Sequence, residues 1–249
     1  LAQGNSGYDV GMNTDHIIRT LVGQNLIQEL DRSLIPNFAN IDEVYLDREF
    51  DPGNVYTIPK SSGSQGFVYD KSVIKRPMET WIDFLDAIYN EASGQVSLLD
   101  DPIALAPLFW SRSTSWNTTD EAVFKEVENQ AVDIAPHIRM FNSYPVQEIA
   151  TGSVALAQCW NGNARQALDA AQNDNLAFVY PGPISELWLD SYHMPTGAVN
   201  IRAAHSWLDY VLNPEIAARE IEYTGYLSPV AGVKEFLDPS LANDPLIFP

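Results

Sequence analysis

The sequence predicts an α/β fold with mixed, mainly parallel sheets. Short apolar runs typical of β-strands alternate with segments of helical spacing, which favours strands joined by crossover helices. Hydrophobic residues make up 45% of the 249 positions, enough for a substantial buried core. This length is near the upper end for one domain, and two lobes of roughly 100 residues each also fit it.

The predicted elements are separated by turn and cap signals. Residues 8–12 read as a strand, and Asn13 and Thr14 are cap candidates for the helix that follows. An extended segment at 57–69 contains a Ser/Gly-rich stretch, which we interpret as a crossing between lobes. Further helices are predicted at 81–88, 121–132, 164–171, 203–212 and 214–223, and further strands at 95–99, 154–160, 176–180 and 187–194. Boundary signals are the Asp101-Pro102 helix start, a turn at 161–163 and a stop at Gly225.

The charge balance excludes some partners. The chain carries 14 Lys plus Arg against 33 Asp plus Glu, a formal net charge of -19. Such a chain offers no cationic surface for phosphates, so we expect no nucleic acid partner, and anionic membrane surfaces are disfavoured. An acidic field attracts cations, although many soluble proteins are acidic only to remain dispersed.

Catalytic and metal-binding motifs are missing from the sequence. Cys159 is the single cysteine, which rules out an internal disulfide and a Cys-rich metal site. The four histidines show no zinc-binding spacing, and no Walker loop or nucleophile elbow occurs. We therefore expect no catalytic residues, no metal and no cofactor. No run of about 18 apolar residues predicts a membrane span, and any export signal must lie upstream of Leu1.

Candidate ligand contacts lie at strand ends, because ligands of open α/β sheets gather at the carboxyl ends of strands. Four such ends carry unusual residues, at 13–16, 100–101, 160–162 and 188–190. Alternation along an extended segment would place Glu186, Trp188 and Asp190 on one face, with two carboxylates flanking an indole. Such a face suits a cationic amine, because the ring attracts the charge and a carboxylate binds the ammonium. An amphipathic edge strand with one solvated face explains the pattern equally well.

The other candidates have ordinary structural explanations when each is taken alone. Asp101 before Pro102 is typical of a helix N-cap, Trp160 ends an apolar strand as core residues do, and Tyr226 fits a surface turn. Asp100 and Asp101 are adjacent and should point apart, which disfavours an acid/base pair.

Longer motifs recur in a fixed order from end to end. They are GYDV at 7–10, GQNLIQELD at 23–31, PNFAN at 36–40, FDPGN at 50–54, YTIP at 56–59, TW at 80–81, LLDD at 98–101, FNS at 141–143, CWNG at 159–162, LWLDS at 187–191, NPE at 213–215 and TGYLSP at 224–229. This series resembles the bacterial spermidine/putrescine-binding proteins, the extracytoplasmic solute-binding proteins of ABC importers.

The resemblance implies a two-lobe, periplasmic-binding-protein-like (type II) clamshell that captures a polyamine between its lobes. It places residues 1–66 and 190–226 in lobe one, and residues 67–189 and 227–249 in lobe two. It also implies a monomer that delivers its amine to an inner-membrane permease, at the periplasmic or extracellular face of the membrane, with or without a lipid anchor. Family members have a further N-terminal segment, so the first lobe is expected to be incomplete.

The resemblance also assigns ligand contacts. Trp160, Trp188 and Tyr226 match aromatic walls of the amine slot, Asp190 matches the principal carboxylate and Asp101 another acid, and Thr14 and His16 match positions near the ligand. Two departures concern the identity of the amine. Ala104 replaces a second acid, for which Glu186 is a candidate substitute, and His16 replaces a tyrosine.

Two rival functions remain at this point. One is a binding protein of the same architecture for another solute, such as an amino acid derivative, a sugar or ferric ion. The other is a hydrolase using Asp101 and Asp190, which no activating base or metal site in the sequence supports.

Overall fold

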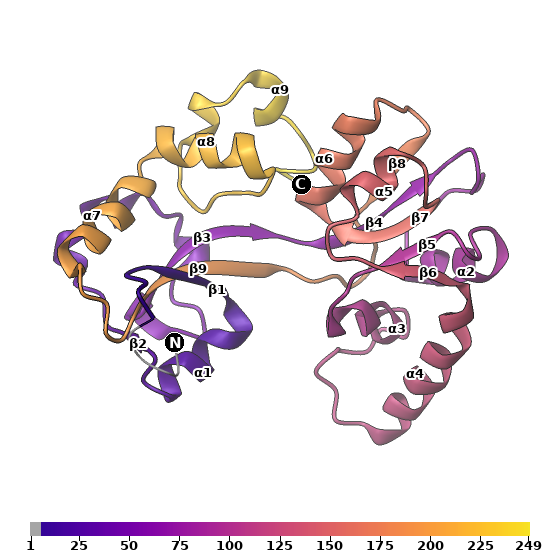
Figure 1. The fold of residues 1–249 in the computed structure, drawn as a ribbon, viewed down its shortest axis with the longest axis horizontal. Helices are drawn as coiled ribbons and strands as arrows, with labels where there is room; N and C mark the ends of the chain where they lie inside the picture. Colours follow the sequence, from indigo (N-terminus) through magenta and orange to yellow (C-terminus); the bar gives the residue numbers. More distant parts are fainter. Residues whose placement is uncertain (1–5) are drawn as a thin grey trace. The chain divides into compact units, whose positions relative to one another are not determined.

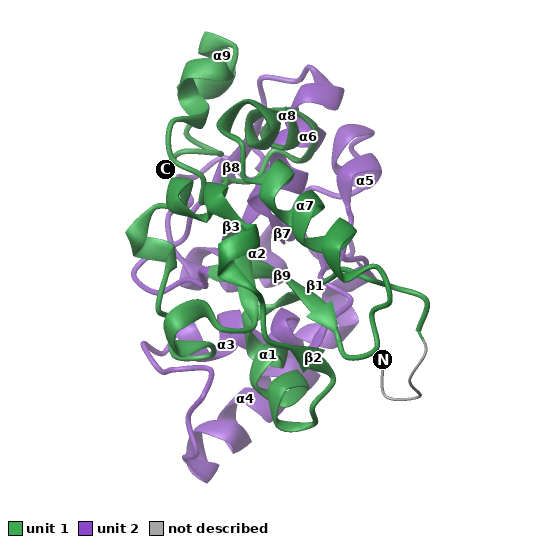
Figure 2. Ribbon diagram, turned by 90° about the vertical axis from the view of Figure 1, so that its left-hand side faces the viewer, with its two compact units in different colours: residues 1–63, 188–249 green, residues 64–187 purple. Residues whose placement is uncertain are grey.

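The computed structural model describes residues 6–249, which form two compact units (Figure 2). Unit 1 contains the described part of residues 1–63 together with 188–249, and unit 2 contains residues 64–187. The start of the predicted first lobe, residues 1–5, lies outside the described residues. The chain leaves unit 1 after Gly63, inside the Ser/Gly-rich stretch, and returns at Trp188.

The C-terminal segment 227–249 differs from its predicted position in lobe two, because it belongs to unit 1. Apolar side chains of this segment pack into the core of unit 1. The backbone is also tied there: Asp42 donates its N–H to the carbonyl of Pro229 at 2.9 Å, and Ala231 donates to Asn40 at 2.8 Å. These contacts join segments that are far apart in the sequence, so the sequence pattern did not predict them.

Unit 1 is organised around one long strand, β9 (Trp188–Pro195). Strands β1 (Gly11–Thr14), β2 (Ile27–Gln28) and β3 (Thr57–Gly63) each pair with it in antiparallel orientation. Helix α8 lies on one side of β3 and β9, and α1 lies on the other (Figure 1). The helices of this unit are α1 (Asp15–Gly23), α7 (Ile201–Val211), α8 (Pro214–Thr224) and the short α9 (Pro239–Ala242).

Unit 2 contains a sheet of five strands in the order β6-β5-β7-β4-β8. The strands are β4 (Gln65–Asp70), β5 (Val96–Leu98), β6 (Ile138–Phe141), β7 (Leu156–Trp160) and β8 (Leu176–Val179). Its helices are α2 (Trp81–Asn90), α3 (Ala106–Trp110), α4 (Glu121–Ile134), α5 (Val146–Ala150) and α6 (Asn161–Ala171). Short 3₁₀ segments in the two units are Arg32–Leu34, Pro36–Asn40, Glu43–Tyr45, Pro52–Asn54, Pro102–Leu105, Ala135–His137 and Val233–Phe236.

The sheet of unit 2 is mixed, as predicted, but the described strands of unit 1 pair antiparallel, and parallel pairing does not predominate. Only β5 pairs in parallel, with β6 and β7, whereas β4 and β9 pair antiparallel with all their partners. The reason is topological. Strand β3 runs out of unit 1 and β9 runs back into it, so these two strands must be antiparallel. The alternation of strands and helices in the sequence does not indicate the direction of a strand relative to its neighbour.

Two local predictions are wrong. The strand expected at 8–12 is β1 at Gly11–Thr14, where pairing with β9 sets its limits. The turn expected at 161–163 is the first turn of α6, which begins at Asn161. Asn161 accepts a hydrogen bond from the N–H of Ser64 at 3.1 Å and donates its own N–H to the Ser64 carbonyl at 3.0 Å. These two bonds hold the helix start against β4.

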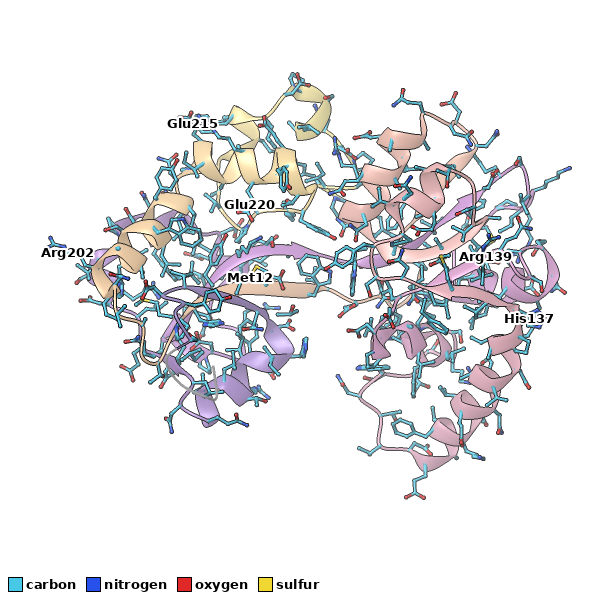
Figure 3. The ribbon with its side chains drawn as sticks, in the orientation of Figure 1. Met12, His137, Arg139, Arg202, Glu215 and Glu220 are labelled. Carbon is cyan, nitrogen blue, oxygen red and sulfur yellow. The ribbon has the colours of Figure 1, made fainter. Side chains whose placement is uncertain are left out.

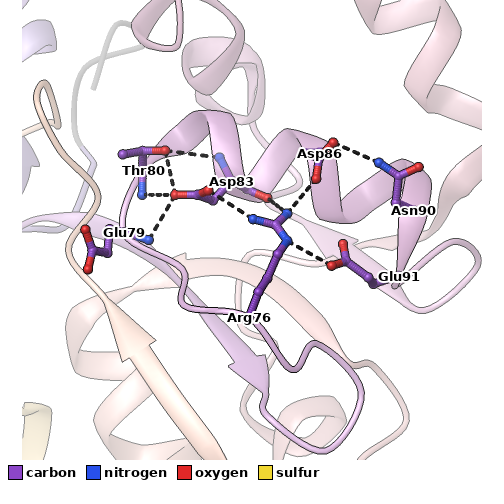
Figure 4. A network of polar contacts seen from close by, with 7 residues as sticks. All are labelled: Arg76, Glu79, Thr80, Asp83, Asp86, Asn90 and Glu91. Carbon is purple, nitrogen blue, oxygen red and sulfur yellow. Dashed lines mark hydrogen bonds and ion pairs between the residues drawn. The ribbon is translucent and has the colours of Figure 1, made fainter.

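A single arginine ties the start of α2 to its end in unit 2 (Figure 4). Arg76 contacts Asp83 at 3.0 Å, Asp86 at 2.7 Å and Glu91 at 2.8 Å, and Asp83 also forms a capping box with Thr80. Interactions with these carboxylates raise the pKa of Arg76, with the hydrogen bond to Glu91 contributing most. This cluster is structural, because Arg76 is paired with three carboxylates on or next to the same helix. In the part of the chain that the structure describes, no helix combines the length and apolar character needed to cross a bilayer.

Candidate functional site

The register of β9 brings Asp190 next to residues of two other strands. Asp190 lies opposite Thr14 of β1 and opposite Ser61 of β3. The β3 ladder shifts register between Pro59 and Ser61, so Lys60 is the extra residue of a β-bulge. Side chains of paired residues project from the same face of a sheet, and Thr14, Ser61 and Asp190 therefore share one face.

Thr14 interacts with Asp190 through its side chain. The Thr14 hydroxyl donates a hydrogen bond to Oδ1 of Asp190 at 2.6 Å. Thr14 does occupy the N-cap position of α1, as predicted, but its side chain makes no capping bond to the helix. A hydroxyl that donates to a carboxylate fixes the rotamer of that carboxylate without cancelling its charge.

Two aromatic rings adjoin this carboxylate on the same strand. Trp188 lies two residues before Asp190 and therefore on the same face of β9, and its ring meets that of Tyr226 edge to face, with centroids 5.0 Å apart. Gly225, with a φ of 75°, ends α8 in the left-handed conformation and starts the turn to Tyr226. The N–H of Ser62 donates to the carbonyl of Leu227 at 2.9 Å, which holds this turn against β3.

A charged pair lies beside the face of β9 that carries Asp190. Lys60 of β3 forms an ion pair with Glu220 of α8, and its ammonium also donates to the Ser61 hydroxyl at 3.2 Å. Burial raises the pKa of the Tyr192 phenol, and the Glu220 and Asp190 carboxylates raise it further. Figure 3 shows Glu220 extending from α8 toward β3 and β9. Neither Lys60 nor Glu220 was a predicted site residue, because the two are 160 positions apart in the sequence and belong to no common motif.

His16 does not contact Asp190. Its side chain is 78% exposed, and its nearest carboxylate is Asp15, 4.0 Å away. Burial raises the pKa of Asp15, and the nearby Asp190 carboxylate raises it to a lesser degree. The predicted position of His16 near the ligand is thus not supported by a contact to the carboxylate.

The opposite face of β9 carries a buried histidine that sequence reasoning missed. His193 lies opposite Gly11, where an added Cβ would come within 2.5 Å of the imidazole. Its Nε2 is 2.8 Å from Oδ1 of Asn13, and Nδ1 has no hydrogen-bond partner among the described residues. Burial lowers the pKa of His193 to about 4. This neutral imidazole holds β1, and therefore Thr14, in register.

The candidates in unit 2 have structural partners of their own. Asp101 caps the Pro102–Leu105 turn by accepting from the N–H of Ile103 at 2.9 Å, which confirms the predicted cap. Glu186 precedes β9 and therefore does not share the alternation of Trp188 and Asp190, and it accepts from the Gln65 amide at 2.9 Å. Ala104 is buried in the core, so it leaves no open place for a second acid.

A buried amide relay in unit 2 also escaped the sequence analysis. Gln158 donates to Gln65 at 2.6 Å, and Gln65 in turn donates to Glu186. Both glutamines are fully buried, and Trp160 ends the same strand as Gln158 and lies opposite Gln65. Burying two amides is costly unless they bond to each other and to a carboxylate. The relay thus fixes the orientation of Glu186.

The remaining chemistry in the described residues does not indicate catalysis. No group of three or more His, Cys, Asp or Glu side chains within residues 6–249 is arranged to hold a metal ion. Burial raises the pKa of Cys159 to about 12, so its thiol is an inert core group. Asp190 lies in unit 1 and Asp101 in unit 2, and each has its own partner, a hydroxyl and a peptide N–H.

The two-unit α/β fold and the acidic, aromatic face of β9 favour a ligand-binding protein. The family of bacterial extracellular solute-binding proteins matches residues 1–249. The chain therefore belongs to the bacterial extracellular solute-binding proteins, a family of receptors rather than enzymes that acts outside the cytoplasm.

Relatives with a curated function agree with this assignment. The chain is 29% identical to the spermidine/putrescine-binding periplasmic protein 1 of Haemophilus influenzae, over 99% of this chain and 68% of that protein. It is 25% identical to the putrescine/agmatine-binding protein of Pseudomonas aeruginosa, over 100% of this chain and 72% of that protein.

A solved structure gives the same fold. The putative spermidine/putrescine ABC transporter protein of Listeria monocytogenes matches with a TM-score of 0.90 and 27% identity, over 99% of this chain and 76% of that one. The fold is accordingly the two-lobe, type II fold of periplasmic binding proteins.

Proposed function

We propose that this protein is the receptor of an ABC importer that captures a polyamine, a putrescine- or spermidine-like cation, and delivers it to an inner-membrane permease. The observation that carries the proposal is the cluster of Thr14, Trp188, Asp190 and Tyr226 in unit 1. The relatives are named as binders of spermidine, putrescine and agmatine, which supports the same ligand class.

The chemistry of the cluster suits an alkylammonium group. Asp190 supplies a carboxylate for the ammonium hydrogens, and its partner Thr14 restricts that carboxylate to one rotamer. Trp188 and Tyr226 supply aromatic surface that attracts a cation and packs against methylene groups. A neutral analogue of the same length gains the packing but lacks the charge-assisted hydrogen bond.

Unit 2 contributes candidate contacts with weaker support. Asp101, Trp160 and Glu186 have residue types that bind amines, and Asp101 and Trp160 also match the motifs of the resemblance. The amide relay gives Glu186 a defined orientation. His16 remains a candidate by motif position alone.

Location and assembly follow from the receptor class. The proposed receptor works at the periplasmic or outer face of the cytoplasmic membrane, free or lipid-anchored, and as a monomer. Several relatives are named as periplasmic, and one structural neighbour from Treponema pallidum is named as a lipoprotein.

Calorimetric titration of the full-length protein tests the function. Putrescine, spermidine and spermine should bind, and neutral 1,4-butanediol should not. Binding should weaken as salt rises, because the dominant contact is between opposite charges. Equal binding of the neutral diol, or no binding of any amine, would refute the proposal.

A further inference from the structure

The ion pair between Lys60 and Glu220 lies next to the proposed amine contact. Lys60 is the bulged residue beside Ser61, and Ser61 lies directly opposite Asp190. Glu220 is on α8, five residues before Gly225 and the Tyr226 turn. The side chains of Lys60 and Glu220 are 14% and 30% exposed, so water screens the pair only in part.

Tyr192 connects the pair to Asp190. Tyr192 follows Asp190 by two residues on the same face of β9, the charges of Glu220 and Asp190 both raise the pKa of its phenol, and its ring centroid is 5.9 Å from the Lys60 ammonium. Lys60, Tyr192, Glu220 and Asp190 therefore form one continuous cluster across β3, β9 and α8. This cluster contains two carboxylates and one ammonium.

The two carboxylates have different partners. Glu220 is paired with the charge of Lys60, whereas Asp190 accepts a hydrogen bond from the neutral Thr14 hydroxyl. Asp15 also lies near Asp190, and the His16 imidazole is 4.0 Å from the Asp15 carboxylate. The cluster of Lys60, Glu220 and Asp190 thus carries one net negative charge, located on Asp190.

We propose that Lys60 is a built-in counter-cation that cancels Glu220 and leaves Asp190 to bind one ammonium group of the ligand. Lys60 is then a specificity-determining residue, because the charge of this cluster sets how strongly a more highly charged amine is preferred. This inference rests on the proposed function. It adds that the single net negative charge of the wild-type cluster limits how much more tightly triamines bind than diamines.

Three variants separate charge compensation from a purely structural role. Lys60→Met exposes the Glu220 charge, so amine affinity should rise, by about fivefold for spermidine at low salt and by less for putrescine, which carries fewer charges. Glu220→Gln leaves the Lys60 charge uncompensated beside Asp190, and affinity for both amines should fall by about fivefold. The double variant restores the net charge, so its affinities should return close to wild type.

Lys125→Met is the matched control, because it removes a lysine from an exposed ion pair with Glu128 on α4 of unit 2. It makes the same change in net charge and should leave both affinities within about twofold of wild type. Thermal unfolding of every variant checks folding, and Lys60→Gln replaces Lys60→Met if the latter unfolds.

Calorimetric titration with putrescine and spermidine decides between the outcomes. Opposite shifts for the single variants, with recovery in the double variant, support the proposal. Weaker binding in both single variants would show that the pair merely tethers α8, and would overturn the proposal while leaving the amine receptor intact. Failure of the wild-type protein to bind either amine would refute the proposed function and this inference together.

Discussion

The face of β9 in unit 1 and the strand ends of unit 2 carry the same residue types but use them differently. In unit 1, strand register places Thr14 against Asp190, and ring packing places Trp188 against Tyr226. In unit 2, Asp101 caps a helical turn and Glu186 ends an amide relay. An acid beside an aromatic residue in sequence is therefore a weak signal until the partners of the acid are known.

The difference has a physical origin. Asp190 is the half-buried residue of a strand whose other residues are buried, and the Thr14 hydroxyl that bonds to its Oδ1 does not cancel its charge. Asp101 and Glu186 each accept from an amide that would otherwise lack an acceptor. Removing an acid from unit 1 should change binding, and removing one from unit 2 should also change stability or local order.

The largest expected effect is on Asp190. Asp190→Asn should weaken putrescine binding by about 100-fold, because an ammonium that loses its carboxylate partner loses a charge-assisted hydrogen bond. Glu186→Gln should weaken putrescine binding by less than about tenfold, since one carboxylate oxygen of Glu186 already accepts a hydrogen bond from the Gln65 amide. Calorimetric titration at low salt measures both.

Glu215→Gln is the control for this comparison, because Glu215 forms an exposed pair with Arg219 on α8 (Figure 3). It should leave the affinity unchanged within about twofold. An affinity of Asp190→Asn equal to that of Glu215→Gln would remove Asp190 from the site.

The second effect concerns stability and pH. The pKa of His193 is lowered by burial to about 4 in the folded protein, against 6.5 for an ordinary histidine. The unfolded chain therefore binds more protons between these values, so the contribution of His193 is complete above pH 6.5 and is lost as pH falls toward 4. We expect this loss to be on the order of 2 kcal/mol.

Urea unfolding of wild type and His193→Gln from pH 7.5 to 4.5 tests this expectation. Glutamine cannot titrate, so the variant should show a flatter dependence of unfolding free energy on pH. His137→Gln is a suitable control, since His137 lies in unit 2 and bonds to the Ser93 hydroxyl. Parallel curves for wild type and His193→Gln would contradict the buried neutral imidazole.

A smaller effect is expected at Thr14. Thr14→Val keeps the shape of the side chain but removes the hydroxyl that donates to Asp190, so amine affinity should fall by about fivefold. Thr57→Val is less suitable as a control, because the Thr57 hydroxyl bonds to buried Asp51. Thr118→Val in unit 2 serves better, and it should bind like wild type.

The smallest effect separates the two roles of Asp101. Serine also caps helices, so Asp101→Ser should retain the stability of unit 2 and weaken putrescine binding by about threefold through loss of charge. Asp101→Ala should also cost about 1 kcal/mol of unfolding free energy. Unchanged binding in Asp101→Ser would leave Asp101 as a cap only.

Local signals predicted much of the fold. The cap at Asp101, the stop at Gly225 and the strand at Trp188–Pro195 depend on residues close together in sequence. Strand direction, the placement of 227–249 and the relay from Gln158 to Gln65 depend on contacts between distant segments, which a single sequence does not encode visibly.

The candidate site shows the same limit. Trp188 and Asp190 were found because strand alternation places them on one face. The pair formed by Lys60 and Glu220 was missed, because only the bulge in β3 and the packing of α8 bring the two together. His193 was missed because a histidine inside an apolar strand gives no signal of what its imidazole will meet.

The central claim is that the face of β9 in unit 1 binds the ammonium group of a small amine. A crystal structure of the full-length protein with bound putrescine tests it most directly. The account predicts an ammonium nitrogen within about 3 Å of an Asp190 carboxylate oxygen, with the Trp188 and Tyr226 rings against the methylene chain. An amine bound with no contact to Asp190 would contradict the account.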